Sequence, residues 1–226
     1  MSTLYIVATP IGNLEDITLR ALRILKEVDL VLCEDTRVTK KLLRHHEIDT
    51  QTMSYHMHSK LSKEQKIIEL LEEGKDVALV SDAGTPAISD PGAILVKHIR
   101  EQCPDVSIES VPGPSAVTAA FSIAGLPVSD FIFFGFLPHK KGRQTLFEEI
   151  AEISRTAVFY ESPHRIVKAL TSLKEHCPNK KVTLVRELTK MYEDVLQGSA
   201  EEILATLEEF PEKLRGEMVV IVSEQK

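Results

Sequence analysis

Short apolar runs alternate with segments of helical periodicity along the first half of the chain. The apolar runs lie near residues 4–8, 28–33, 77–81 and 106–110, and a shorter extended piece lies near 51–54. Helical patterns begin near Leu19, Val38 and Ala93. Short apolar runs bounded by turn signals are typical of strands buried on both faces. The alternation therefore predicts a mostly parallel sheet with helices on both sides.

The pattern changes after the Pro–Gly–Pro bend that follows the fourth of these runs. Strands are expected near 131–136, 156–161, 181–187, 192–197 and 217–223. Helices are expected at 144–153, 163–176 and 199–208. Several of the connections are short enough for antiparallel pairing, which favours a mixed sheet. The sequence thus predicts an α/β protein with two α/β domains, residues 1–112 and 113–226.

Three loops follow directly on predicted strands of the first half. They are Thr9–Asp16, Ser81–Gly92 and Val111–Ala120. Open α/β sheets bind ligands outside the carboxyl ends of their strands. Gly84 would let a ligand approach the backbone, and Pro86 and Pro91 would stiffen the second loop. None of the loops carries a dinucleotide fingerprint or a P-loop lysine, so we expect a polar, nucleoside-sized ligand that is not a polyphosphate. The alternative is ordinary turn and cap chemistry.

Composition limits the class of protein. With 226 residues, 43% of them hydrophobic, the chain can bury a substantial core. No apolar run is long enough to span a membrane, and the first strand begins so early that we expect no signal peptide. The three cysteines have neither paired nor metal-like spacing, so a reducing cytoplasm and no metal site are expected.

A net charge of −7 argues against a general nucleic-acid binder. Any RNA contact must therefore be confined to basic patches. One candidate is the amphipathic basic helix at 37–46, and another is the loop 137–143, with Lys140, Lys141 and Arg143. Basic helix faces are often only solvated surface, which is the alternative interpretation of both patches.

Two further groups of residues carry candidate chemistry. Glu34 and Asp35 end a predicted strand, and Arg37 follows them. Either carboxylate could assist removal of a proton from a hydroxyl group. The alternative is an N-cap and a salt bridge for the next helix. His164 and Arg165 lie at an expected helix start, where a histidine is electrostatically unfavourable, so they are candidate RNA contacts.

Seven motifs occur in order and cover nearly the whole chain. They are VATPIGNLEDITLRA, LCEDTR, SDAGTPAISDPG, VPGPSAVTAA, FFGFLP, FYESPHR and RELTKMYEDV. Together they resemble the ribosomal RNA small subunit methyltransferase I family, which belongs to the tetrapyrrole-methylase-like superfamily of class III S-adenosylmethionine methyltransferases. The resemblance implies two α/β domains with the cofactor in the cleft between them. It also implies a cytoplasmic homodimer that transfers a methyl group from S-adenosyl-L-methionine to the ribose 2′-hydroxyl of a cytidine. That cytidine lies in the decoding region of 16S rRNA in the 30S ribosomal subunit.

The resemblance also assigns residues to the cofactor. The positions that match the superfamily's cofactor-lining motifs are Pro10, Ile11, Ala83, Gly84, Thr85, Ile88, Ser115, Ala116, Glu161, Ser162, Leu188, Gly216 and Glu217. A bend before the last strand is the alternative interpretation of Gly216.

Two other functions remain open at this point. The first is a methyltransferase that acts on a tetrapyrrole-like small molecule, although this chain reads Gly84-Thr85-Pro86 where the superfamily usually carries Gly-Asp-Pro. The second is a non-enzymatic nucleotide-binding or ribosome-assembly module, which would bind the cofactor without turnover.

Overall fold

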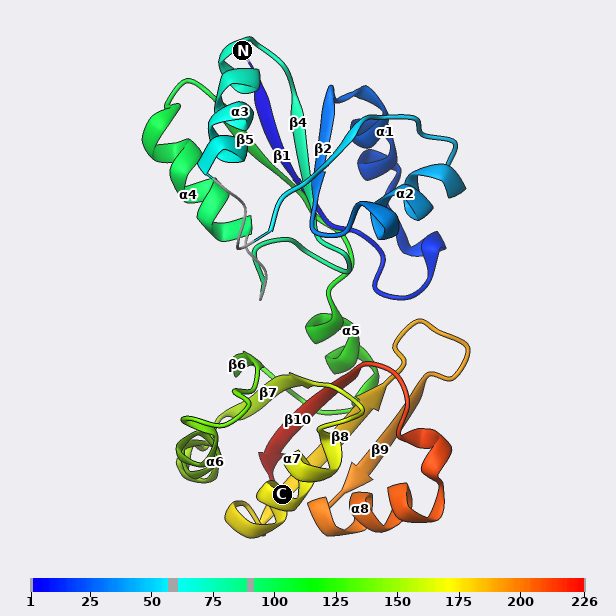
Figure 1. The fold of residues 1–226 in the computed structure, drawn as a ribbon. Coiled ribbons are helices and arrows are strands. Elements are labelled where there is room, and N and C mark those ends of the chain that lie inside the picture. The colour runs from blue at the N-terminus through cyan, green and yellow to red at the C-terminus, as the bar shows by residue number, and fades with distance from the viewer. Residues whose placement is uncertain (1, 57–60, 89–91, 226) are drawn as a thin grey trace. The chain divides into compact units, whose positions relative to one another are not determined.

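The computed structural model describes residues 2–56, 61–88 and 92–225. The chain divides into two compact units, Met1–Ser115 and Ala116–Lys226, each built on a five-stranded sheet (Figure 1). Both units combine a sheet with packed helices, so the predicted fold class is confirmed. Pro91, which was expected to stiffen the second loop, lies outside the described residues.

The first unit contains an entirely parallel sheet in the order β3-β2-β4-β1-β5. Its strands are β1 (Thr3–Val7), β2 (Leu30–Cys33), β3 (Thr52–Ser54), β4 (Val77–Val80) and β5 (Ser107–Val111). Its helices are η1 (Leu14–Asp16), α1 (Leu19–Glu27), α2 (Thr36–His45), α3 (Leu61–Glu72) and α4 (Gly92–Gln102). The strands agree with the sequence prediction to within about two residues. β2 and β4 are short apolar runs that are buried throughout, whereas β3 and β5 are partly exposed.

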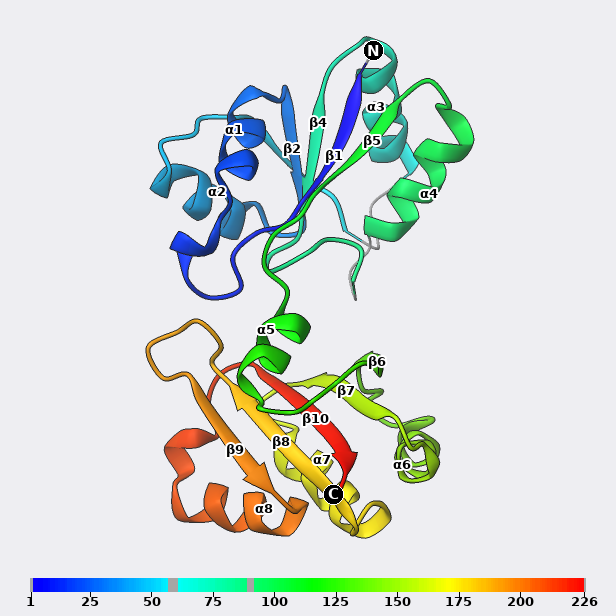
Figure 2. The same cartoon turned by 180° about the vertical axis from the view of Figure 1, so that it is seen from behind.

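The helices of the first unit lie on opposite faces of its sheet, α1 and α2 on one and α3 and α4 on the other (Figures 1 and 2). Leu25, Val31 and Leu43 belong to the core on the α1–α2 face, and Leu79 and Leu95 to the core on the other. The neighbouring strands β1 and β4 therefore lead into helices on opposite faces. Their loops diverge at this switch point, which is where open α/β sheets bind ligands.

The second unit contains a mixed sheet in the order β6-β7-β10-β8-β9. Its strands are β6 (Phe131–Phe136), β7 (Thr156–Glu161), β8 (Lys180–Arg186), β9 (Asp194–Gly198) and β10 (Met218–Glu224). Its helices are α5 (Ala116–Ile123), α6 (Arg143–Glu152), α7 (Ile166–His176), α8 (Ala200–Glu209) and η2 (Pro211–Lys213). β6 and β7 are parallel, and the other pairs are antiparallel, as predicted. Fully buried Phe147 and Phe159 lie in its core.

One predicted helix start is wrong in a way that affects the candidate site. α7 begins at Ile166 rather than at residue 163, so His164 and Arg165 lie in the turn before the helix. Pro163 occupies that turn, whose first hydrogen bonds run from the Arg165 and Ile166 amides to the Ser162 carbonyl. His164 still lies next to the N-terminus of α7, two residues before its first helical residue.

Candidate active site

The loops after β1, β4 and β5 are joined by hydrogen bonds at the carboxyl edge of the first sheet. The Thr9 amide donates to the Gly84 carbonyl at 2.9 Å, and the Gly84 amide donates back to the Thr9 carbonyl at 3.1 Å. The Thr9 hydroxyl donates to the Ser81 carbonyl at 3.0 Å. The Thr85 hydroxyl donates to the Pro114 carbonyl at 3.1 Å. These hydrogen bonds join the three loops at one edge of the sheet, and two of the predicted cofactor residues, Gly84 and Thr85, take part in them.

The backbone of the β4 loop is bent into conformations that side chains disfavour. Gly84 has φ +84°, and a Cβ there would lie 3.4 Å from Cγ2 of Ile11. Ala87 also has a positive φ of 69°, which is uncommon for a non-glycine residue. Such conformations persist where the surrounding structure imposes them, and they cluster at ligand sites. The bend therefore supports a binding role for this loop.

The cofactor residues predicted in these three loops differ in their exposure. Pro10, Ile11 and Gly84 are buried, Thr85 is half-buried, and Ile88 is 50% exposed. Ala83 is exposed, while Ser115 and Ala116 are half-buried. The predicted residues at this edge thus include buried positions, such as Pro10 and Ile11, and an exposed apolar side chain, that of Ile88.

Asp35 forms the N-cap and salt bridge that the sequence left as an alternative. Its carboxylate accepts a hydrogen bond from the Arg37 amide at 2.8 Å and pairs with the Arg37 guanidinium at 2.6 Å. The hydrogen bonds from Arg37 lower the pKa of Asp35 to about 2. A carboxylate with so low a pKa is a weak proton acceptor. The neighbouring Glu34 is half-buried.

Asp82 links the Glu34–Asp35 segment to the β4 loop. Its Oδ1 accepts a hydrogen bond from the Asp35 amide at 3.1 Å, although the two residues are 47 positions apart. The sequence prediction did not single out Asp82. Its place as the second residue of the SDAGTP motif, directly after a buried strand, was the available signal.

In the second unit, the end of β7, the end of β8 and the start of β10 lie at one edge of the sheet. Met218 of β10 pairs with Glu161 on one side and with Arg186 on the other. Gly216 has φ +79°, and a Cβ there would lie 1.9 Å from Oε1 of Glu187. This bend and close approach require glycine at residue 216, whatever it contacts.

The loop after β8 combines predicted and unpredicted features. Leu188 is 8% exposed, and the neighbouring Thr189 has φ +64°. The Thr189 hydroxyl is buried and has no hydrogen-bond partner within the described part of the chain. Buried polar atoms are usually paired, so this hydroxyl is a candidate ligand contact that sequence reasoning missed. Its position beside Leu188, within RELTKMYEDV, was the only signal.

Glu217 takes part in an ion-pair network. Lys190 Nζ lies 3.1 Å from the Glu187 carboxylate and 3.2 Å from that of Glu217. Burial by itself would lower the pKa of Lys190, but the two carboxylates raise it overall. The Glu217 side chain is 77% exposed, so it remains accessible despite this contact.

Arg143 is a correction to the predicted RNA-binding loop. Arg143 is only 6% exposed, because its guanidinium pairs with the fully buried carboxylate of Glu161. Nη2 of Arg143 lies 3.3 Å from Oε2 of Glu161. Arg165 approaches the other carboxylate oxygen at 3.2 Å and is 20% exposed. Arg143 therefore cannot reach an RNA phosphate. The Glu161 side chain is likewise committed to the two arginines rather than to a cofactor.

The two arginines that pair with Glu161 also donate hydrogen bonds to backbone carbonyls of the basic loop 137–143. Arg143 donates to the Pro138 carbonyl at 3.2 Å, and Arg165 donates to the Leu137 carbonyl. Lys140 and Lys141 of this loop are exposed. His164 is exposed in the neighbouring turn, while Ser162 is half-buried there. The loop thus exposes two lysines, while hydrogen bonds from the two arginines hold its backbone at residues 137 and 138.

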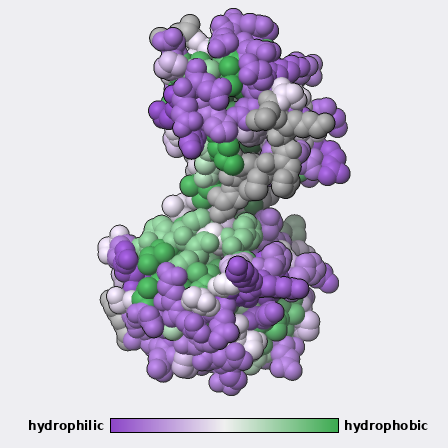
Figure 3. All heavy atoms as spheres, turned by 60° about the vertical axis from the view of Figure 1, so that its left-hand side comes forward, coloured by the Kyte–Doolittle hydropathy of each residue, from purple (hydrophilic) through white to green (hydrophobic). Residues whose placement is uncertain are grey.

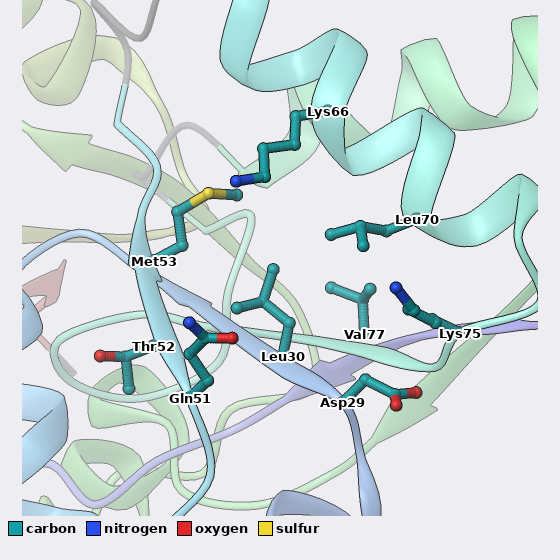
Figure 4. A pocket seen from close by; sticks show the side chains of 9 residues that line it. All are labelled: Asp29, Leu30, Gln51, Thr52, Met53, Lys66, Leu70, Lys75 and Val77. Carbon is teal, nitrogen blue, oxygen red and sulfur yellow. The ribbon is translucent and has the colours of Figure 1, made fainter.

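Figure 4 shows a hollow of about 530 Å³ elsewhere in the first unit. It lies beside the amino ends of β2, β3 and β4, under side chains of α3. The residues that line it are Asp29, Leu30, Gln51, Thr52, Met53, Lys66, Leu70, Lys75 and Val77. Because α/β sheets bind ligands at the opposite, carboxyl edge, we do not assign this hollow to the active site.

Other kinds of site receive no support from the described residues. Within residues 2–56, 61–88 and 92–225, no group of three or more His, Cys, Asp or Glu could hold a metal ion. Burial raises the pKa of the thiols of Cys33, Cys103 and Cys177, so they are poor nucleophiles. In the same part of the chain no helix is both long and apolar enough to cross a membrane.

Comparison with known proteins defines the class first. The profile of the tetrapyrrole (corrin/porphyrin) methylase family matches residues 3–204. Solved structures share the fold: the methyltransferase CobJ gives a TM-score of 0.73 at 19% identity, covering 99% of this chain and 95% of CobJ. A uroporphyrin-III C-methyltransferase from Thermus thermophilus, solved with S-adenosylhomocysteine, gives 0.65 at 20% identity, covering 98% and 97%.

More similar relatives define the particular family. A ribosomal RNA small subunit methyltransferase I from Halalkalibacterium halodurans is 47% identical over 97% of this chain and 75% of its own length. The Thermotoga maritima protein of that name is 44% identical over 99% of each chain. The chain therefore belongs to the ribosomal RNA small subunit methyltransferase I family, as its motifs predicted. It is an S-adenosylmethionine-dependent methyltransferase.

The candidate loops suit this cofactor chemically. Residues 9–16, 81–88 and 112–115 contain no lysine or arginine, and the cofactor has no phosphate to bind. Its sulfonium is cationic, and Asp82 provides a carboxylate at the same edge. When bound, the cofactor supplies an electrophilic methyl group.

Proposed function

We propose that this enzyme methylates the ribose 2′-hydroxyl of a cytidine in the decoding region of 16S rRNA. The observation that carries the proposal is 44–47% identity, along nearly the whole chain, to proteins named ribosomal RNA small subunit methyltransferase I. The LCEDTR and FYESPHR motifs of the chain also fit the RNA-modifying branch of the superfamily better than the tetrapyrrole branch. The substrate is 16S rRNA, free or within the 30S subunit.

The proposed cofactor contacts come from both units. In the first unit they are Pro10, Ile11, Ala83, Gly84, Thr85, Ile88 and Ser115. In the second unit they are Ala116, Ser162, Leu188, Gly216 and Glu217, together with the backbone of Glu161. We add Thr189, because of its unpaired hydroxyl.

Alignment is the main catalytic contribution that we propose for the protein. Methyl transfer needs the ribose oxygen, the methyl carbon and the sulfur in line, and positioning alone lowers a barrier by several kcal/mol. The low pKa of Asp35, about 2, disfavours it as the proton acceptor. Asp35 instead orients Arg37, whose side chain is 89% exposed and available to an RNA phosphate. Glu34 is the remaining candidate base.

Lys140, Lys141 and His164 are the proposed RNA contacts of the second unit, because all three are exposed. Arg165 supports the loop through its hydrogen bonds to Leu137 and Pro138. RNA contact by Arg165 is restricted to the exposed fifth of its side chain.

We also propose that the enzyme is a cytoplasmic homodimer. Figure 3 shows apolar residues gathered on the visible face of the second unit. Phe131 and Phe136 on the edge strand β6 are 41% and 60% exposed, and Ile123 at the end of α5 is 40% exposed. Exposed apolar edges of sheets are typical of association surfaces. Light scattering tests this: a fully active 25.3 kDa monomer at micromolar concentration would exclude the dimer.

The decisive experiment offers three substrates in parallel. The purified enzyme is incubated with labelled cofactor and with 30S subunits, free 16S RNA or a porphyrinoid, and the product is mapped by mass spectrometry. We expect a 2′-O-methylated cytidine in one of the RNA reactions. Label in the porphyrinoid alone would instead establish a tetrapyrrole methyltransferase, and cofactor binding without any turnover would indicate a non-enzymatic module.

A further inference from the structure

A second basic surface lies in the first unit, between α2 and η1. It is a hollow of about 480 Å³, which we call the α2 hollow. The residues that line it are Leu14, Arg37, Lys40, Lys41, Arg44 and His45. η1 and α2 lie side by side in both views of the fold (Figures 1 and 2). Nε2 of His46 lies 3.3 Å from the Leu14 carbonyl and holds the two elements together.

α2 differs from α1, α3 and α4 in carrying cations without any acidic residue. α1 pairs Arg23 with Glu27 at 2.8 Å, and α4 pairs Lys97 with Glu101 at 3.9 Å, both at i,i+4 spacing. α2 has four lysines and arginines and no acidic residue. Within the described parts of the chain, its three cations beyond Arg37 form no ion pair within 4.0 Å. A chain with net charge −7 thus carries a local excess of positive charge on α2, although Glu15 and Asp16 lie on the neighbouring η1.

The spacing of these cations suits a linear polyanion. Lys40, Lys41 and Arg44 fall at i, i+1 and i+4, and with Arg37 they follow one side of the helix. The row from Arg37 to Arg44 is about 10 Å long at the helical rise. A row of this length can contact more than one phosphate of a single strand. Leu14 and the aliphatic stems of the basic side chains add apolar surface below the charges.

The α2 hollow also adjoins the candidate active site within the same unit. η1 follows the β1 loop that contains Pro10 and Ile11. α2 begins directly after Asp35, whose amide donates to Asp82 of the β4 loop. A strand bound along α2 would therefore pass the edge at which we place the methyl donor.

We propose that the α2 hollow binds the phosphate backbone of the substrate rRNA beside the modified nucleotide. This inference rests on the proposed function, and it assigns part of the RNA contact to Lys40, Lys41 and Arg44. The first unit would then hold the RNA as well as cofactor-binding loops, and the exposed lysines of the second unit would supply a separate contact.

The test compares two triple variants with equal loss of charge. One is Lys40→Ala/Lys41→Ala/Arg44→Ala. The control is Lys26→Ala/Lys97→Ala/Arg100→Ala, which removes three exposed cations from other helices of the same unit. Binding to purified 30S subunits and to free 16S RNA is measured across a salt series, and S-adenosylhomocysteine affinity is measured by calorimetry.

We expect the α2 variant to bind RNA about 10-fold or more weakly at ~0.15 M salt and to lose about 2–3 units of salt slope. Its S-adenosylhomocysteine affinity should equal that of the wild type, which shows that the fold is intact. Equal weakening in the control variant, or wild-type RNA binding by the α2 variant, would overturn the inference. Because binding is measured without turnover, a wild-type enzyme that methylates no RNA would refute the proposed function separately.

Discussion

The two units use their sheets in different ways. In the first, every strand is parallel, so all carboxyl ends lie at one edge, and the loops after β1, β4 and β5 meet there. In the second, β10 runs antiparallel to both of its neighbours. One edge of that sheet therefore combines strand ends with a strand start, which joins Glu161 and Arg186 to Met218. In a parallel sheet, the loops that follow the strands all lie at the same edge, so the sequence alone predicts which loops meet. In a mixed sheet, that prediction also requires knowing which strands pair and in which direction.

The polar groups at the two edges are also stabilised differently. The first unit joins its loops through backbone carbonyls and hydroxyls, such as those of Thr9 and Thr85. The second unit buries a carboxylate between two arginines. A buried ion pair tolerates the loss of one partner poorly, because the remaining charge is left without compensation. The second edge should therefore be the more sensitive of the two to single substitutions.

The largest effect is expected for Glu161→Gln. It leaves the almost fully buried guanidinium of Arg143 without its carboxylate, and such losses cost about 3–5 kcal/mol of stability. Denaturant unfolding of the full chain measures the change. Glu175→Gln, at an exposed position of α7, is the control and should stay within about 0.5 kcal/mol of the wild type. Equal stability of both variants would show that the cluster contributes little.

The next effect concerns the first unit and should appear in binding rather than folding. Gly84→Val introduces a side chain at φ +84°, in contact with Ile11, at the edge that we assign to the cofactor. Affinity for S-adenosylhomocysteine should fall at least ~10-fold, about 1.4 kcal/mol. Gly74→Val is a matched control, because Gly74 has φ +85° and open space around it. If both variants lose the same affinity, the β4 loop does not touch the cofactor.

The sequence predicted the fold, and it predicted that three loops follow strands at the carboxyl edge of the first sheet. Both predictions depend only on local patterns. Buried apolar runs such as Val77–Val80 identify strands, and the loop that follows each one is then placed by topology. Burial of a charged side chain cannot be predicted in this way. Arg143 is buried because it meets Glu161, which lies 18 positions away on another element. For Asp35 the sequence offered both interpretations. The structure shows the N-cap and the ion pair with Arg37, and the catalytic role stays a prediction.

A smaller effect separates exposed from buried cations in the basic loop. Lys140→Ala/Lys141→Ala should lower the salt slope of RNA binding by about 1.4–1.8 and leave stability unchanged. Arg143→Ala should instead destabilise the second unit, because Glu161 then loses its buried partner. Salt-series binding and denaturant unfolding of each variant provide the two measurements. A Lys140→Ala/Lys141→Ala variant with the wild-type salt slope would remove these lysines from the RNA-binding surface.

The smallest effect is expected for Asp35→Asn. Hydrogen bonds from Arg37 hold the pKa of Asp35 at about 2, below the roughly 3.9 of an unfolded chain. Its contribution to stability is therefore fully present above about pH 4 and is lost as the pH falls towards 2. Between pH 6 and 9 the group does not titrate, so the pH dependence of methylation should keep its shape in the variant. Asparagine also preserves the N-cap of α2.

Glu34→Gln is the companion variant: if Glu34 is the base, that substitution alone lowers turnover strongly. Loss of turnover with an altered pH profile in Asp35→Asn would identify Asp35 as the base instead. If both variants turn over normally, the proton is lost to water, and the enzyme acts through alignment.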